Sequence, residues 1–239
     1  MLTYQIVISG IVIEVEKKRV KNLRLTVHPP DGTVKISAPL LYKDAAIRAF
    51  LESKLHWIKK HRDKYNGKEK PVVPEYVSGE IHSYLGECYV LQLVNHNKPP
   101  RIEIANGRID LYIVEGSTKQ QRKKAIDEWY RKQLKEISSP LISKWENIMG
   151  VSVNEFGIKN MKTRWGSCNI RAKRIWLNLE LARKPFHCLE FIIVHELVHL
   201  LERNHNAKFK SYMDEFMPGW RSYKDELNKC PIKKLDWEF

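Results

Sequence analysis

The chain has 239 residues, of which 43% are hydrophobic and 29% charged. This composition excludes a disordered or fibrous protein and allows either one large domain or two small ones. Lysine and arginine number 42, and aspartate and glutamate number 28, so the formal net charge is 42 − 28 = +14. Such an excess attracts anionic partners. It does not distinguish nucleic acid, nucleotide or acidic protein from a plain lysine-rich surface.

The cysteines and the apolar segments indicate in which cellular compartment the protein is expected. Cys88, Cys168, Cys188 and Cys230 are widely spaced and form no CxxC pair, which argues against a disulfide framework and against a cysteine zinc site. The first strand-like segment lacks a basic leader, so we expect no signal peptide. No apolar stretch approaches the roughly 20 residues of a membrane helix. We therefore expect a cytoplasmic protein that does not enter a membrane.

The first part of the chain reads mainly as β-structure. Alternating apolar residues predict strands over 4–9, 11–15, 23–28 and 33–38, the last two joined by a turn at Pro29-Pro30-Asp31-Gly32. Helical spacing follows over 43–64, and then a Pro-bearing link over 66–74. Two further hairpins are expected, 81–84 with 89–93 around Gly86, and 101–104 with 109–114 around Asn106-Gly107.

The second part mixes helices and strands. A long helix is expected to begin at Ser117 or Thr118, to kink or restart at Pro140, and to end at Gly150. Strands are expected within 155–181, and helices over 186–203, after Asn206 and over 221–228. The predicted fold is α+β, with a β-rich N-terminal domain containing one helix over 1–116 and a second domain over 117–239.

The helix predicted over 186–203 contains the motif HExxH at His195, Glu196 and His199. Residues four apart lie on one helix face, so both imidazoles can bind one metal ion. Glu196 follows the first ligand directly, which places its carboxylate to accept a proton from water that the metal has acidified. Burying two imidazoles and a carboxylate in so apolar a helix would destabilise the fold unless another group paired with them. The alternative is a pair of histidines hydrogen-bonded within the core.

A catalytic zinc ion commonly has three protein ligands. His205 stands ten residues after His195 and is the first candidate for the third. We expect the helix to end at Asn204 in a left-handed conformation that returns His205 to the metal. Asp214 or Glu215 on the following helix is the alternative. The sequence thus predicts zinc bound by His195, His199 and His205, with Glu196 as general base.

The longer pattern resembles a known family. The chain has RWGSC at 164–168, IWLN at 175–178, HExxH, Asn204-His205 and Phe209, and in its first part LHWI at 55–58 and LGE at 85–87. It is similar to the YgjP-like family of predicted metal-dependent hydrolases, grouped with the SprT/WLM-type zincin-like metallopeptidases. The resemblance implies a zincin-like catalytic domain, zinc, the three histidine ligands and a catalytic Glu196.

The strand around 164–168 has a second interpretation. In zincins a sheet edge runs beside the active-site helix and can pair with an extended substrate. Arg164 would then stabilise an oxyanion or bind a phosphate, whereas the simpler alternative is a surface charge. Trp165 is more simply a core aromatic residue, Cys168 a small buried residue and Met217 a core residue.

Three functions are compatible with these residues. The first is a metallopeptidase acting on polypeptides. The second is a phosphoanhydride hydrolase, such as a nucleoside-triphosphate pyrophosphatase, because activated water can also attack phosphorus. The third is a nucleic-acid-associated protein with structural zinc, whose basic segments at 54–64 and 119–124 bind phosphates weakly. We favour the peptidase.

Overall fold

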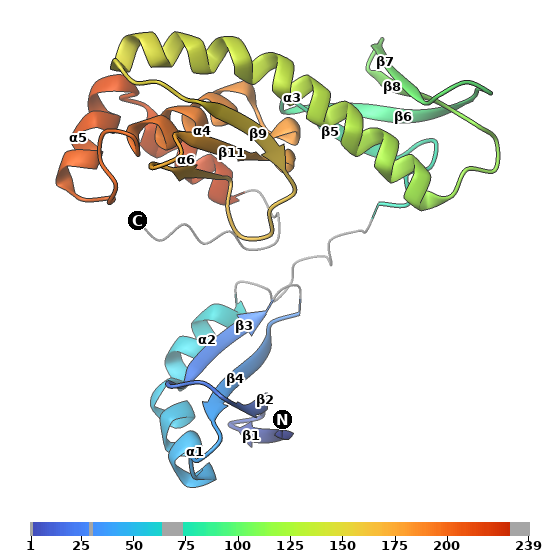
Figure 1. The fold of residues 1–239 in the computed structure, drawn as a ribbon. Helices are drawn as coiled ribbons and strands as arrows, with labels where there is room; N and C mark the ends of the chain where they lie inside the picture. Colours follow the sequence, from blue (N-terminus) through green and yellow to red (C-terminus); the bar gives the residue numbers. More distant parts are fainter. Residues whose placement is uncertain (1, 29–30, 64–73, 230–239) are drawn as a thin grey trace. The chain divides into compact units, whose positions relative to one another are not determined.

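The computed structural model describes residues 2–28, 31–63 and 74–229. These residues form two compact units, divided between Val73 and Pro74 (Figure 1). The predictions for Pro29-Pro30, for residues 64–73 of the expected helix and link, and for Cys230 lie outside the described residues.

In its described residues the first unit has a four-stranded sheet and two helices. Its elements are β1 (Leu2–Ile8), β2 (Ile11–Lys18), β3 (Arg24–His28), β4 (Thr33–Pro39), α1 (Asp44–Ser53) and α2 (Leu55–Asp63). The strand order is β1-β2-β4-β3, with β2 and β4 parallel and the other neighbours antiparallel. Alternation buries one face of the sheet, and Ile47, Leu51 and Ile58 from the helices complete this core. The helix expected over 43–64 divides at Lys54.

The second unit begins with a sheet of the same topology. Its strands are β5 (Ile81–Tyr84), β6 (Glu87–Asn95), β7 (Arg101–Ala105) and β8 (Arg108–Ile113). They are ordered β5-β6-β8-β7, with β6 and β8 parallel. Both predicted hairpins are present. Asn106 and Gly107 have φ values of 50° and 73°, as their type I′ turn requires.

The domain boundary differs from the one expected at residue 116. Leu91 and Leu111 of the second sheet share a core with Tyr130 and Leu134 of the long helix that follows, while the first sheet has a core of its own. Alternating apolar residues predict both sheets, but only the first sheet forms a compact unit apart from the long helix and the residues that follow it. The boundary therefore lies at residues 73 and 74.

The long helix is α3 (Lys119–Met149). Thr118 caps it in a capping box with Gln121, and Gly150 ends it with a φ of 67°, both at predicted positions. Pro140 lies within the helix but does not divide it. Leu134 and Leu141, on either side of the proline, are both buried in the core and hold the two halves in place.

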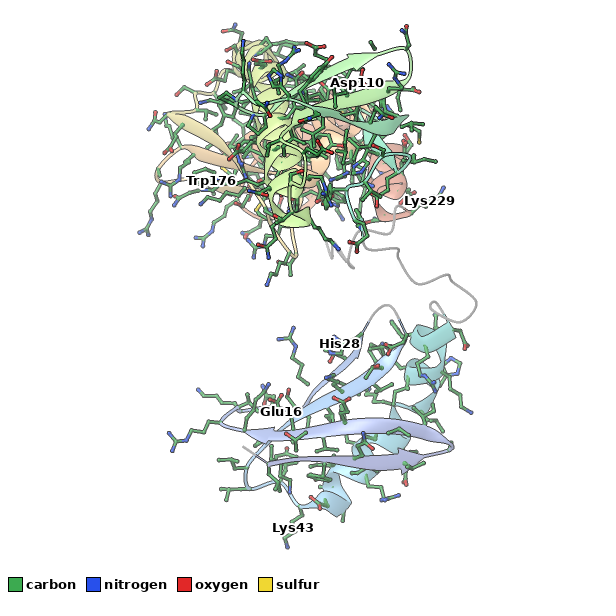
Figure 2. The ribbon with its side chains drawn as sticks, turned by 90° about the vertical axis from the view of Figure 1, so that its right-hand side faces the viewer. Glu16, His28, Lys43, Asp110, Trp176 and Lys229 are labelled. Atoms are coloured by element: carbon green, nitrogen blue, oxygen red, sulfur yellow. The ribbon has the colours of Figure 1, made fainter. Side chains whose placement is uncertain are left out.

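The remaining elements are one buried helix, α4, and the strands and helices that pack around it. They are β9 (Glu155–Lys159), β10 (Gly166–Asn169), β11 (Arg174–Asn178), the 3₁₀ helix η1 (Leu179–Arg183), α4 (Phe186–Val198), α5 (Ala207–Phe216) and α6 (Trp220–Lys229). The sheet order is β10-β11-β9, so β10 is an edge strand. Helix α4 contacts α3, α5, α6 and β10. Figure 2 shows Trp176 of β11 among side chains that end in nitrogen atoms.

The fold is mixed α+β, as expected, with three small sheets in the part of the chain that the structure describes. The α4 segment is apolar on all sides because it is buried on all sides: from Cys188 to Val198 every residue except Glu190 is buried. Among the described residues, no helix combines the length and the apolar character needed to cross a bilayer.

Candidate metal centre

Helix α4 carries the first two candidate ligands. His195 and Glu196 are 1% and 2% exposed, and His199 lies at the C-cap of the helix. The prediction that the helix continues to Asn204 and ends there in a left-handed conformation is wrong. The helix ends at Val198, and its last carbonyls instead accept hydrogen bonds in a tight turn that includes Leu200 and Leu201. Asn204 has no positive φ.

The segment after this turn carries His205 back to α4. The Asn204 amide donates to Glu202 Oε1 (3.1 Å), and the Asn206 amide to the Asn204 carbonyl (2.8 Å). Asn206 then caps α5, as predicted, by accepting from the Phe209 amide (3.0 Å). These local bonds fix the path of a short connection and thereby position His205.

The structure brings His195, His199 and His205 together. One ligand atom from each lies within 4.8 Å of the others. His195 Nε2 and His205 Nε2 are 3.1 Å apart. The Phe209 ring packs against all three imidazoles, with centroid distances of 4.7–5.0 Å.

Burial keeps the three imidazoles neutral. It lowers the pKa of His195 well below 6.5 and lowers the pKa of His199. The pKa of His205 falls to about 4, first through burial and then through the positive charge of neighbouring groups. Neutral imidazole is the form that binds a metal ion.

The geometry fits a bound divalent metal ion. Two metal–nitrogen bonds of about 2.0–2.1 Å at a tetrahedral angle separate their nitrogens by about 3.3 Å, close to the His195–His205 separation. His199 Nδ1 lies 3.3 Å from the Glu202 carbonyl. Donation to that carbonyl leaves Nε2 as the ligand atom and fixes the orientation of the ring, as outer-shell partners do in metal sites.

The alternative ligands have other contacts. Asp214 Oδ1 accepts from Trp220 Nε1 (2.8 Å), and Asp214 also pairs with Arg221. Neither Asp214 nor Glu215 belongs to the histidine group.

A second group of potential ligands consists of His187, Cys188 and Glu226. His187 and Cys188 are consecutive on a helix, and His187 Nε2 already pairs with Glu226 Oε2 at 2.6 Å. We interpret this group as a structural contact between α4 and α6.

Glu196 lies against the edge strand. A Cβ atom on Gly166 would stand 2.5 Å from Glu196 Oε1 and 2.8 Å from its Cγ. Only glycine therefore fits between β10 and the carboxylate. Burial raises the pKa of Glu196 to about 8, and the positive charge of Arg164 acts in the opposite direction. A base with a pKa near the working pH is suited to proton transfer.

Asn178 fixes the loop that precedes β10. Its Nδ2 donates to the carbonyls of Arg164 (2.7 Å) and Met161 (3.0 Å), and its Oδ1 accepts from the Glu180 amide (3.2 Å). The residue is fully buried. Arg164 is thereby held at the start of the edge strand, with an exposed side chain.

The sequence interpretation missed Gly166, Asn178 and Phe209 as site residues, although the motifs used for the resemblance include all three. Trp165 and Met217 lie in the core, as expected. Burial raises the pKa of the Cys168 thiol to about 12, which keeps it protonated and makes it a poor nucleophile.

Comparisons with known proteins give three findings. Two crystal structures of metallopeptidase zymogens, Pyrococcus abyssi abylysin and Methanocaldococcus jannaschii jannalysin, resemble part of the chain with 19% and 23% identity and TM-scores of 0.35 and 0.33. The matches cover 37% and 39% of this chain and 90% and 92% of theirs. No curated protein matches significantly.

The third finding concerns the family. The family model described as the YgjP-like metallopeptidase domain matches residues 21–230. This range contains the HExxH motif and extends over both compact units. The chain therefore belongs to the YgjP-like family of metallopeptidases.

Proposed function

We propose that the chain is a zinc-dependent metallopeptidase with a zincin-like catalytic part. His195, His199 and His205 would hold the zinc ion, and Glu196 would be the general base. The convergence of three neutral imidazoles beside a buried carboxylate carries this proposal. Three nitrogen ligands with one position left for water or substrate are typical of catalytic zinc.

The residues of the chain would divide the work of peptide hydrolysis. When bound, zinc would polarise the carbonyl of the scissile bond and acidify the attacking water. Glu196 would accept the proton of that water and pass it to the leaving amine. Arg164 would supply positive charge for the oxyanion.

Substrate positioning would fall to β10. Among the residues that the structure describes, this strand pairs only with β11, at the edge of its sheet, and it contacts α4. An extended polypeptide can add to such an edge through backbone hydrogen bonds. The scissile bond would then lie beside Glu196, which touches Gly166 at the start of the strand.

A phosphoanhydride hydrolase is the second candidate. Arg164 and Lys210, two cations near the site, favour it because both would attract a nucleotide. The same three histidines and Glu196 would serve that reaction.

One experiment separates the two candidates. The zinc-loaded full chain is incubated with unfolded casein and, in parallel, with a panel of nucleoside triphosphates. The proposal expects casein fragments and no phosphate or pyrophosphate release. The Glu196→Gln variant must lose the activity while keeping its zinc, since Glu196 is not a ligand. Nucleotide hydrolysis without proteolysis, or proteolysis that survives in Glu196→Gln, contradicts the proposal.

A further inference from the structure

Cations from one loop and two helices lie near the metal centre. Arg164 precedes β10 and is the charged group that acts on Glu196. Lys210 on α5 directly follows Phe209, whose ring contacts all three histidines. The positive charges of Lys210 and of Lys224 on α6 both act on His205. We call Arg164, Lys210 and Lys224 the cationic rim.

A row of aromatic rings lies between Lys224 and His195. The Lys224 Nζ lies 5.9 Å from the centroid of the Trp220 ring, which stacks on Phe191 at 6.5 Å. The Phe191 ring is in turn 6.0 Å from His195. The positive charge of Lys224 also acts directly on His195.

Two members of the rim differ from many other cations of this unit. Arg183 pairs with Glu180 at 3.3 Å and Lys144 with Glu190 at 2.9 Å. Arg164 and Lys210 form no ion pair with any residue that the structure describes. Both side chains are exposed. Two exposed cations without carboxylate partners beside a catalytic centre are available to an anionic ligand.

The sequence around the edge strand β10 is also rich in lysine and arginine and poor in carboxylates. Residues 156–179 contain no aspartate or glutamate, and their cations are Lys159, Lys162, Arg164, Arg171, Lys173 and Arg174. These cations stand on both sides of β10 in the sequence. Apart from Arg174, which pairs with Glu155 at 3.6 Å, this excess of cations would favour an acidic polypeptide on β10.

We infer that this peptidase prefers acidic polypeptide segments, with aspartate or glutamate close to the bond that is cut, recognised by Arg164 and Lys210. The inference rests on the proposed peptidase function and names its substrate class. A polypeptide is favoured over a nucleotide because β10 offers a strand edge, which a nucleotide cannot use. Ion pairs at such partly exposed positions each change affinity by a few-fold.

The test measures binding independently of activity. Zinc-loaded Glu196→Gln protein is titrated, by fluorescence anisotropy, with a labelled twelve-residue peptide rich in Asp and Glu and with its Asn/Gln counterpart. At low salt we expect the acidic peptide to bind about 10-fold more tightly, and the difference to shrink in 0.5 M NaCl because salt screens exposed charges. Adding Arg164→Glu and Lys210→Glu together should abolish the difference.

Lys208→Glu is the matched control. Lys208 is an exposed lysine on α5, two residues before Lys210, and its Nζ lies 5.8 Å from the Tyr212 ring centroid. This charge reversal should leave the acidic preference unchanged. Equal binding of the two peptides, or a preference that survives the double reversal or disappears in Lys208→Glu, overturns the inference.

Cleavage then distinguishes this inference from the function on which it rests. The wild-type zinc protein is given a mixed peptide library, and cleavage sites are read by mass spectrometry. Enrichment of Asp and Glu within about three residues of the cut supports the inference. Cleavage without enrichment overturns it and leaves the peptidase proposal intact. If neither library nor casein is cut, the peptidase proposal fails, and the inference fails with it.

Discussion

The contact between Gly166 and Glu196 gives the sharpest prediction, because it links one missing Cβ atom to the proposed general base. In Gly166→Ala the new methyl group would stand 2.5–2.9 Å from the Oε1, Cγ and Cδ atoms of Glu196, whereas ordinary contacts begin at 3.4 Å. To relieve this clash, the Glu196 side chain or β10 must shift by about 0.5–0.9 Å. Glu196 lies on a buried helix, so the carboxylate has little room to move elsewhere.

The expected effect falls mainly on activity. A misplacement of about 1 Å at a catalytic group can lower the rate about 100-fold, while overpacking costs roughly 1–3 kcal/mol of stability. We therefore expect kcat on casein-derived fluorogenic peptides to fall about 100-fold. The zinc content should stay near that of the wild type, because the three histidines are untouched.

Gly157→Ala is the matched control. Its Cβ would also collide with a side chain, the Trp176 ring, but on β9 and β11 rather than against Glu196. This variant should lose stability and keep kcat once it is folded. The reasoning is refuted if Gly166→Ala retains wild-type kcat, or if the two variants lose kcat equally.

Three further predictions concern the metal, the edge loop and pH. Zinc at 100 times its Kd should stabilise the wild type by about 2.7 kcal/mol and raise its Tm by roughly 5–10 °C. In a thermal melt, the His205→Ala variant should show no such shift in Tm. An equal shift in this variant would exclude His205 as a ligand. Asn178→Ala should lower the free energy of unfolding in urea by roughly 2–4 kcal/mol, since buried loop groups lose their partners; an unchanged midpoint would contradict this. Burial, aided by Arg183, lowers the pKa of His82 below 6.5, so the unfolded chain binds a proton that the folded chain does not. Stability should then fall as pH drops below about 6.5, by at most about 1.4 kcal/mol per pH unit from this residue, and parallel pH profiles for the wild type and His82→Phe would refute the assignment.

Much of the fold could be predicted because local rules agree with tertiary packing. The hairpin at Asn106-Gly107, the start of α3 at Thr118 and its end at Gly150 all depend on one or two residues with special backbone or capping properties. The end of α4 could not be predicted in this way. It depends on a turn whose hydrogen bonds are made by ordinary apolar residues, Leu200 and Leu201, so no residue type marks it.

The candidate site shows a similar limit. The spacing of His195, Glu196 and His199 predicts a shared helix face, because the period of a helix is fixed. The close approach of Gly166 to Glu196 joins two segments thirty residues apart, and only the packing of β10 against α4 reveals it. The division into compact units at residues 73 and 74 could not be predicted for the same reason, since which sheet shares a core with α3 is a property of long-range packing.

The unbroken course of α3 constrains how this protein can move. Thirty-one helical residues span about 46 Å, and along this length the helix contacts β7 of the second sheet, η1, and α4, the helix that carries His195 and Glu196 of the candidate metal centre. A rod of this kind couples the two regions mechanically, so a tilt of one requires a tilt of the other. Any opening that admits a substrate must therefore arise outside this rod.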